Sequence, residues 1–255
     1  MTEVNMTEKK KCGKKWMAIS VASLIIVPIL VNASIINFAP PSVARFFLSP
    51  TKIRSVIEYD QKKSQADAEK KAKKLIKSDL QDKKGNLLHT ALDPVIGNVT
   101  NPEITIIEYI DYKCGYCKKA NDEMKRILSE DKYKGKIRLI IKNYPVIGGE
   151  PSLYAAEVAT GFFAKHPEKF LDLHSKLFAS ELKDVKEIDA ILLSYGEKAS
   201  SLKTTEITDS IVANFNFARE IQVSGTPALI IGDELISGFI TYEQLAAKID
   251  EKMKK

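Results

Sequence analysis

The sequence predicts an α/β domain, and three features of its second half indicate this class. A nearly continuous apolar and β-branched run at 104–110, "ITIIEYI", is typical of a central strand that is covered on both faces. Apolar residues recur at helical spacing directly after this run. Two further strand patterns follow at 136–145 and 227–240, and helical periods fill the long stretch between them. The predicted order is strand, helix, strand, several helices, two strands and a closing helix.

Composition and charge describe an ordinary globular protein. The chain of 255 residues is 44% hydrophobic and 28% charged, enough for one good-sized domain with extensions. Its 39 basic and 33 acidic residues give a net charge of 39 − 33 = +6. Much of the excess comes from lysines near the N-terminus: Lys9, Lys10, Lys11, Lys14 and Lys15. The nearly balanced remainder argues against nucleic acid as a partner.

An uncharged run from Trp16 to Phe38 predicts an export segment at residues 1–38. The run is long enough to cross a hydrocarbon core, which needs about 20 helical residues, and the lysines before it keep that side in the cytoplasm. "VNA" at 31–33 has the small residues after which a signal peptidase cuts. Two outcomes therefore remain open, a soluble periplasmic protein after cleavage and a protein tethered to the inner membrane by residues 16–38.

A lysine- and alanine-rich stretch at 51–84 predicts one or two helices behind a proline-rich spacer at 39–50. We assign residues 39–90 to this spacer and helical arm. Apolar residues recur at helical spacing at both ends of the stretch but not in its middle: Ile53, Val56, Ile57, Ala68, Ala72, Leu75, Ile76 and Leu80. Two interpretations stay open, an arm for self-association or partner binding and a solvated stalk.

Residues 91–255 are predicted to form the folded domain, with a helical insertion at about 150–212. "KIRLIIKNYP" predicts a second buried strand, and "PALIIGDELISGFI" predicts two short strands joined through "GDE". The closing helix begins with Thr241 and Gln244 at capping-box spacing.

Cys114 and Cys117 are the only thiols that the predicted export places outside the cytoplasm, because Cys12 precedes the apolar run. A disulfide that closes so short a loop removes little chain entropy, worth roughly 2 kcal/mol, so stabilisation is a weak explanation for the pair. A structural zinc site is disfavoured because it needs four ligands and there is no second cysteine pair. The histidines are expected at the surface or at helix caps: His89, His166 and His174.

The position of the cysteine pair, where a strand ends and a helix begins, predicts two unlike thiols. The sulfur of Cys114 meets unsatisfied backbone N–H groups and the positive end of the helix dipole, which favour its thiolate form. Cys117 falls one turn later on the helix face that packs on the sheet, so it should be buried and slower to ionise. We expect an exposed Cys114 to exchange with disulfides and a shielded Cys117 to resolve the mixed disulfide.

Two further features fit redox chemistry. Pro227 opens a predicted strand, and a cis peptide between Thr226 and Pro227 would present the Thr226 backbone to an incoming chain. Glu108 is a carboxylate on an otherwise apolar central strand. Two roles are open for Glu108, a buried proton acceptor near the sulfurs and a strand-end residue paired with a lysine such as Lys142.

The segments "DYKCGYCK", "KNYPVIGGEPSLYAA" and "VSGTPALIIGDELISG" together resemble the bacterial DsbA-like thiol:disulfide oxidoreductases of the thioredoxin superfamily, particularly a surface-protein variety with an N-terminal helical arm. The resemblance implies a thioredoxin fold interrupted by a helical domain. It also implies that Cys114 is the nucleophile, Cys117 the resolving cysteine and Pro227 a cis-proline beside them. Glu108 occupies the position of a family carboxylate that helps proton movement.

Two departures from the family pattern bear on the direction of electron flow. Gly115 and Tyr116 stand between the cysteines, where the strongest oxidants of the family carry Pro-His. Thr226 before the proline is more typical of reducing or isomerising relatives. The resemblance therefore identifies the chemistry more firmly than its direction.

The sequence as a whole predicts an exported thiol–disulfide oxidoreductase that needs no cofactor beyond its own cysteine pair. The expected partners are unfolded or reduced exported proteins and a membrane redox partner that recycles the pair. Two alternatives stay open. One is an oligomeric disulfide isomerase or reductase that associates through residues 51–84, and the other is a non-catalytic surface protein whose CxxC is a relic.

Overall fold

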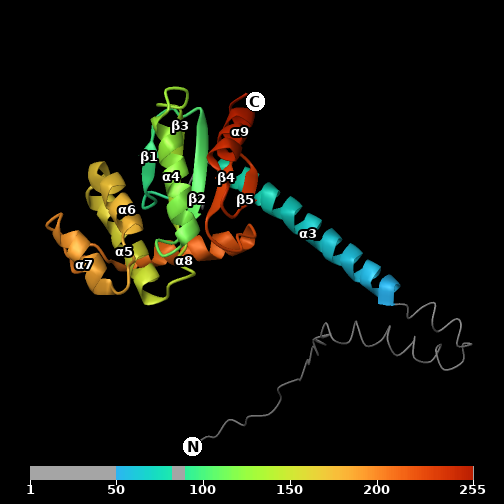
Figure 1. Ribbon diagram of the computed structural model, residues 1–255, viewed down its shortest axis with the longest axis horizontal. Coiled ribbons are helices and arrows are strands. Elements are labelled where there is room, and N and C mark those ends of the chain that lie inside the picture. Colours follow the sequence, from blue (N-terminus) through green and yellow to red (C-terminus); the bar gives the residue numbers. More distant parts are fainter. Residues whose placement is uncertain (1–49, 82–89, 255) are drawn as a thin grey trace, which may run out of the picture. The chain divides into compact units, whose positions relative to one another are not determined.

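The computed structural model of the chain describes residues 50–81 and 90–254 (Figure 1). The leader predicted at 1–38 and most of the proline-rich spacer lie outside the described residues. Within the described ranges, no helix combines the length and the apolar character that crossing a bilayer requires.

The arm forms a single helix, α3 (Pro50–Gln81), within the prediction of one or two helices. This helix crosses the boundary between two units of the chain, Met1–Lys63 and Ser64–Lys255. The described part of the first unit is the first half of α3. The side chains that are described in this half are exposed, and Ile57 and Tyr59 are 50% and 67% exposed.

The second unit is built around a five-stranded mixed sheet in the order β1-β3-β2-β4-β5 (Figure 1). Strands β2 and β3 are parallel, and the other neighbouring pairs are antiparallel. The strands are β1 (Val95–Gly97), β2 (Ile104–Ile110), β3 (Ile137–Asn143), β4 (Ala228–Ile231) and β5 (Glu234–Ser237). The two short strands predicted around "GDE" are therefore β4 and β5, and the two predicted buried strands are β2 and β3.

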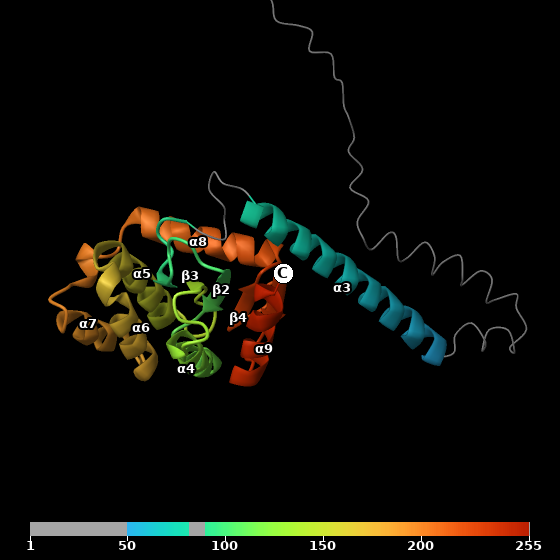
Figure 2. The ribbon, with the colours of Figure 1, turned by 90° about the horizontal axis from the view of Figure 1, so that it is seen from above.

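Helices cover both faces of this sheet. Figure 2 shows α4 and α9 on one face, with α8 and the second half of α3 on the other. Besides the second half of α3, the α-helices described in this unit are α4 (Gly115–Ser129), α5 (Glu150–Lys165), α6 (Phe170–Ala179), α7 (Val185–Leu193), α8 (Thr205–Glu220) and α9 (Tyr242–Met253). Helices α5 to α8 are inserted between β3 and β4, so the expected thioredoxin fold with a helical insertion is confirmed. The capping box of Thr241 and Gln244 is also present at the start of α9.

Side chains of β2 alternate between two cores, which explains its continuous apolar pattern. Ile106 and Ile110 lie in the core under α4 and α9. Ile107 and Tyr109 lie in the core on the opposite face of the sheet. A strand that is covered on both faces favours apolar side chains at every position, so the buried Glu108 is the exception that calls for a chemical reason.

The sequence prediction missed strand β1. It is only three residues long, too short for an alternating pattern, and Pro94 precedes it. It pairs antiparallel with β3, and Val95 lies opposite Ile140. The strand ends at Gly97, which has a φ of +89°, and a Cβ atom there would lie 2.4 Å from the carbonyl oxygen of Ile137. Only glycine fits this close approach of two backbones.

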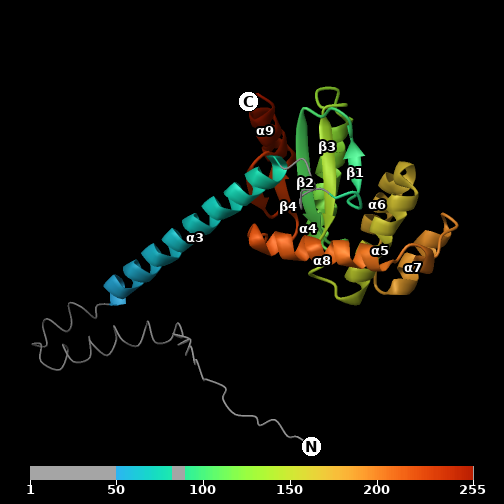
Figure 3. The same ribbon diagram turned by 180° about the vertical axis from the view of Figure 1, so that it is seen from behind.

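The second half of α3 is part of the domain core. Figure 3 shows the end of this helix beside the sheet. Ala72 and Ile76 are 3% and 0% exposed, and they pack in one cluster with Ile107, Tyr109 and the α8 residue Phe217. The sequence left two interpretations of the arm open, an arm for self-association or partner binding and a solvated stalk. Neither of them included packing of the arm against the sheet of its own chain. The interruption in the apolar pattern of the arm falls at the transition from the exposed half to the packed half.

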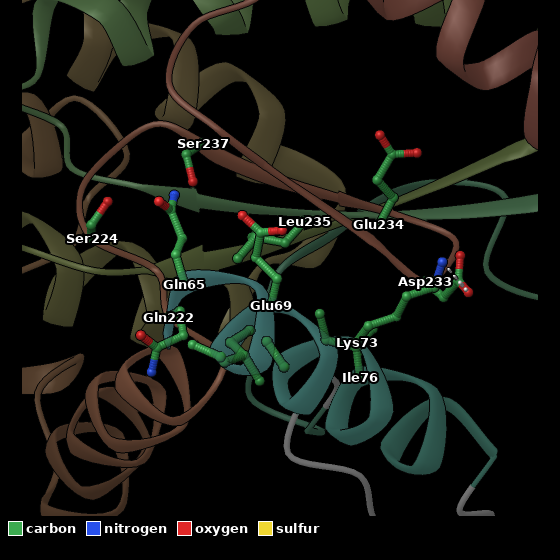
Figure 4. Close-up of a pocket in the computed structure, with 13 residues that line it drawn as sticks. Gln65, Glu69, Lys73, Ile76, Gln222, Ser224, Asp233, Glu234, Leu235 and Ser237 are labelled. Carbon is green, nitrogen blue, oxygen red and sulfur yellow. Dashed lines mark ion pairs between the residues drawn. The ribbon is translucent and has the colours of Figure 1, made fainter. Parts of the chain in front are cut away.

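A groove of about 690 Å³ lies between the second half of α3 and the β4–β5 hairpin (Figure 4). Gln65, Glu69 and Lys73 border it on the helix, and Leu235 and Ser237 border it on β5. Lys73 forms an exposed ion pair with Asp233, at 3.4 Å. The cysteines are not among the residues that line this groove.

Replacing Ile76 with alanine should lower the free energy of unfolding by roughly 2–5 kcal/mol, because the change opens a cavity in the core. The matched control is Ile57→Ala on the exposed half of the same helix, which should change the free energy by about 0.5 kcal/mol or less. Equilibrium unfolding in urea measures both values. Equally small effects would show that the second half of α3 is not part of the domain core.

Candidate active site

The cysteine pair lies where the sequence predicts it, between the end of β2 and the start of α4. Cys114 occupies the N-cap position of α4. Its N–H donates to the carbonyl oxygen of Asp111 at 2.9 Å, which closes a turn after the strand. Its own carbonyl oxygen accepts from Lys118 at 3.1 Å and begins the helical hydrogen bonds. Both cysteines are in the free thiol form.

The expectation of an exposed Cys114 is wrong, because the residue is only 5% exposed. Its Sγ atom lies 3.4 Å from the carbonyl oxygen of Thr226 and donates to it, so the loop before β4 lies beside the thiol. Cys117 is 0% exposed and packs in the core under α4 with Met124 and Ile127, as predicted. Cys114 is therefore the more exposed of the two cysteines, as predicted, although the difference in exposure is small.

The environment of Cys117 keeps its thiol protonated. Burial raises its pKa far above the ordinary range, and the nearby charges of Cys114 and Glu108 act in the same direction. The backbone amide of Asp111 opposes this shift without reversing it. Burial therefore disfavours the thiolate form of Cys117, as the sequence predicts.

The peptide bond between Thr226 and Pro227 is cis, as expected. This bond immediately precedes β4, and the carbonyl oxygen of Pro227 accepts from Gly238 at 2.9 Å, which ties the loop to the end of β5. The carbonyl of Thr226 is the group that faces Cys114. The Thr226 hydroxyl is buried and has no hydrogen-bond partner among the described residues.

Glu108 is buried on the face of the sheet that carries the cysteines. Its side chain is 2% exposed, and its Oε1 atom has no hydrogen-bond partner in the described part of the chain. Burial raises the pKa of Glu108 to about 8. The pairing of Glu108 with Lys142 is wrong, because Lys142 lies opposite Tyr109 in register and binds Asp93 at 2.6 Å on the other face. The position and burial of Glu108 favour its other interpretation, a proton acceptor near the sulfurs.

Gly115 and Tyr116 form the exposed part of the motif. The Tyr116 side chain is 59% exposed, and its ring centroid lies 6.2 Å from that of Phe239 and 5.2 Å from the amine of Lys119. A Cβ atom on Gly115 would meet nothing within 4 Å. These two residues are therefore available to an incoming chain and are not constrained by packing.

Sequence reasoning missed Asp111, which is 1% exposed directly after β2. Its carboxylate accepts hydrogen bonds from the amides of Lys113 and Ile147 and from the hydroxyl of Ser152, at 2.9, 2.7 and 2.7 Å. The only sequence signal was its position between an apolar strand and the first cysteine, where aspartate commonly binds the amide two residues on.

The prediction for the histidines is wrong for His174, which is 1% exposed. Its Nδ1 atom lies 2.9 Å from the hydroxyl of Tyr112, and burial lowers its pKa to about 3, so the ring is neutral. The buried ring contributes aromatic packing to the insertion, which helical spacing alone did not reveal. His166 ends α5 as a cap residue, and its Nε2 atom lies 2.7 Å from Glu197. His89 lies outside the described residues.

Across residues 50–81 and 90–254, there is no group of three or more His, Cys, Asp or Glu side chains that could hold a metal ion. The reactive groups that the fold brings together are two thiols, a buried carboxyl group and the carbonyl before a cis-proline. This combination can exchange disulfides with a polypeptide, since one sulfur adjoins the surface loop and the second sulfur lies one turn behind it.

A cysteine pair at the start of the first helix of a thioredoxin fold, beside a cis-proline, defines a thiol–disulfide oxidoreductase. The family model described as Thioredoxin matches residues 89–251, and the chain belongs to this family.

Comparison with known proteins supports the same class. The chain is 24% identical over 174 residues to disulfide bond formation protein D of Bacillus subtilis, covering 63% of this chain and 77% of that protein. A periplasmic thioredoxin-like protein from Salmonella enterica serovar Typhimurium is 32% identical, with a TM-score of 0.58 and coverage of 66% of this chain and 94% of that one. The catalytic domain of Proteus mirabilis ScsC is 26% identical, with a TM-score of 0.63 and coverage of 72% and 99%. The expected DsbA-like class is confirmed.

Glu108→Gln should remove a pH dependence of stability. Between the ordinary pKa of 4.5 and the raised value of about 8, the unfolded carboxyl group ionises while the folded one keeps its proton. The contribution of Glu108 to the free energy of unfolding is therefore fully present below pH 4.5. It is lost as the pH rises from 4.5 through about 8, and the wild type then loses roughly 3–5 kcal/mol relative to the glutamine variant. Urea unfolding of both proteins from pH 4 to pH 9 measures this difference. Parallel curves would contradict the burial of an unpaired carboxyl group.

Proposed function

We propose that this protein is an exported thiol–disulfide oxidoreductase that forms or exchanges disulfides in exported proteins through Cys114 and Cys117. One observation carries the proposal. The two thiols at the start of α4 are unlike, because Cys117 is fully buried with a raised pKa, whereas Cys114 borders the loop that carries Thr226 and Pro227. A pair built in this way separates the exchanging sulfur from the resolving one.

In the oxidising direction, a client thiolate attacks the Cys114 sulfur of the Cys114–Cys117 disulfide. Cys117 leaves as a thiolate, and a mixed disulfide forms between Cys114 and the client. A second client thiolate then attacks the client sulfur of that bond and displaces the Cys114 thiolate. The client gains one disulfide, and two electrons remain on the protein as its dithiol. The reducing direction is the reverse of these steps.

Glu108 is proposed as the group that exchanges the proton of Cys117. When Cys117 leaves as a thiolate, its burial makes the charged form costly, and a nearby proton donor lowers this cost. A carboxyl group with a pKa of about 8 still holds its proton at neutral pH and can donate it. The Oε1 atom has no hydrogen-bond partner among the described residues, so no other bond competes with this transfer.

The site takes its clients from unfolded or reduced exported proteins, and a membrane redox partner recycles the pair without any other cofactor. The predicted leader at 1–38 supports export, and the comparison with a periplasmic thioredoxin-like protein supports the same location. Gly115 and Tyr116 between the cysteines and Thr226 before Pro227 favour a moderate oxidant or an isomerase over an extreme oxidant. Equilibration of the cysteine pair with glutathione buffers measures its reduction potential, which decides whether the protein donates disulfides to its clients or reduces them.

Cys114→Ser should lower the rate of insulin reduction by at least about a hundredfold, because the exchanging sulfur is lost. Cys117→Ser should accumulate a mixed disulfide with insulin, visible as a mass increase that disappears on reduction. Cys12→Ser is the matched control and should keep the wild-type rate, since Cys12 precedes the predicted domain. Wild-type activity in Cys114→Ser would favour the relic alternative instead.

A second candidate function is an oligomeric disulfide isomerase that associates through α3. Ile57 and Tyr59 on the first half of this helix are 50% and 67% exposed, and paired copies of the chain would cover them. An isomerase with several active sites would hold a misfolded client at more than one position.

The solution mass separates the two candidates. Self-association through α3 predicts a multiple of the 28.5 kDa chain mass, less any cleaved leader, by light scattering. Ile57→Asp together with Tyr59→Asp should then return the protein to monomers, because charges would be buried without partners. A monomeric wild type would remove the case for the isomerase.

A further inference from the structure

The three residues before Cys114 turn their side chains toward the helical insertion. Asp111, Tyr112 and Lys113 form the connection between β2 and α4, and none of them is exposed. Each side chain binds a different part of the segment between β3 and β4. A connection that only joined a strand to a helix would need no such contacts.

Asp111 binds the beginning of the insertion. Its carboxylate accepts from the Ile147 amide and from the hydroxyl of Ser152, which lies in the first turn of α5 and is 0% exposed. Ser152 in turn accepts from the amide of Gly148 at 2.9 Å. A buried carboxylate with three neutral donors is satisfied only while the two loops keep this relative position.

Tyr112 binds the middle of the insertion. Its hydroxyl lies 2.9 Å from Nδ1 of His174 on α6, and its ring packs 4.8 Å from that of Phe178. Because burial keeps His174 neutral, Nδ1 can accept the hydrogen bond from the Tyr112 hydroxyl. The ring is 4% exposed, so this contact is shielded from water.

Lys113 binds the connection that follows α6. Its amine donates to the carbonyl oxygen of Leu182 at 2.8 Å, in the connection between α6 and α7. The stem of Lys113 passes over Gly148, where an added Cβ atom would lie 2.2 Å from Cδ of the lysine. Gly148 therefore makes room for the lysine to reach its acceptor.

We propose that Asp111, Tyr112 and Lys113 are positioning residues through which the helical insertion sets the reactivity of Cys114. The proposal rests on the assignment of Cys114 as the exchanging thiol. Three contacts to three separate points of the insertion fix both the place and the orientation of the connection. The carbonyl of Asp111 then holds the amide of Cys114 at 2.9 Å, so the anchored segment leads directly to the reactive residue.

The physical consequence concerns the start of α4. The helix N-terminus favours the thiolate only while the sulfur stays close to the first amides of the helix. If the anchors are loosened, the connection gains conformations in which the sulfur lies farther from these amides. The thiolate then loses part of its stabilisation, and Cys114 reacts more slowly at neutral pH.

Lys113→Met tests this inference, because methionine keeps the apolar stem and loses the bond to Leu182. Alkylation of Cys114 by iodoacetamide, followed by mass spectrometry from pH 4 to pH 9, reports the thiolate without needing a client. Lys113→Met should slow alkylation at pH 6 by roughly three- to tenfold. Tyr112→Phe should act in the same direction.

Two matched variants separate positioning from charge. Lys118→Met removes the same charge from an exposed lysine of α4, and it should leave the pH profile close to that of the wild type. Gly148→Ala keeps every charge but displaces the Lys113 stem and the Ser152 hydroxyl that binds Asp111, and it should act in the same direction as Lys113→Met. Lys113→Arg, which can still donate to Leu182, should restore most of the wild-type rate.

Urea unfolding of each variant completes the test. The proposal holds if the alkylation profile changes in the anchor variants and not in Lys118→Met, at pH values where all variants are folded. Equal changes of the alkylation profile in Lys113→Met and Lys118→Met would show that the lost charge causes the effect, and they would overturn the proposal. Loss of stability with an unchanged profile would also overturn it. An inactive wild type in the insulin assay would instead reject the proposed function, since alkylation does not depend on a client.

Discussion

The register between β2 and β4 is the constraint on which the site depends. Tyr109 lies opposite Ala228, so the residue that begins β4 meets the end of β2. Pro227 and Thr226 immediately precede that position, and the cysteine segment immediately follows β2. The contact between Cys114 and Thr226 thus joins residues 112 positions apart in the sequence. A slip of one residue would turn every side chain of β4 to the other face and carry the Thr226 carbonyl away from the sulfur.

Alternation along β2 keeps two buried ionisable groups, Glu108 and Lys142, apart. Glu108 faces α4 and the cysteines, whereas its neighbour Tyr109 faces the side on which Lys142 binds Asp93. Lys142 is 0% exposed and would pair with Glu108 and favour its ionised form if the two side chains shared a face. Because the sheet separates them, Glu108 keeps a raised pKa and Lys142 keeps its own partner. The same strand therefore supplies a carboxyl group for proton transfer and a structural ion pair.

Local periodicity was enough to predict β2, β3, the β4–β5 pair, the start of α9 and the placement of the cysteines. Features that depend on distant segments were not predicted in this way. Cys114 is covered by Thr226, His174 is buried by the packing of the insertion around Tyr112, and the second half of α3 is buried by α8. In each case the covering residues are far away in sequence, and no pattern within one segment encodes the contact. The cis state of Pro227 came from the family resemblance.

The helical insertion and the helix α3 are additions to the thioredoxin fold, and they differ in their contacts with the segment that carries the cysteines. The insertion leaves the sheet after β3 and returns at β4, and its contacts with Asp111 and Lys113 reach the segment that ends at Cys114. The second half of α3 packs on the other face, against Ile107 and Tyr109. An influence of the arm on the thiols has to pass through the backbone of β2 or through the loop before β4. The insertion acts on the segment itself, so changes in its sequence should tune the chemistry more directly than changes in the arm.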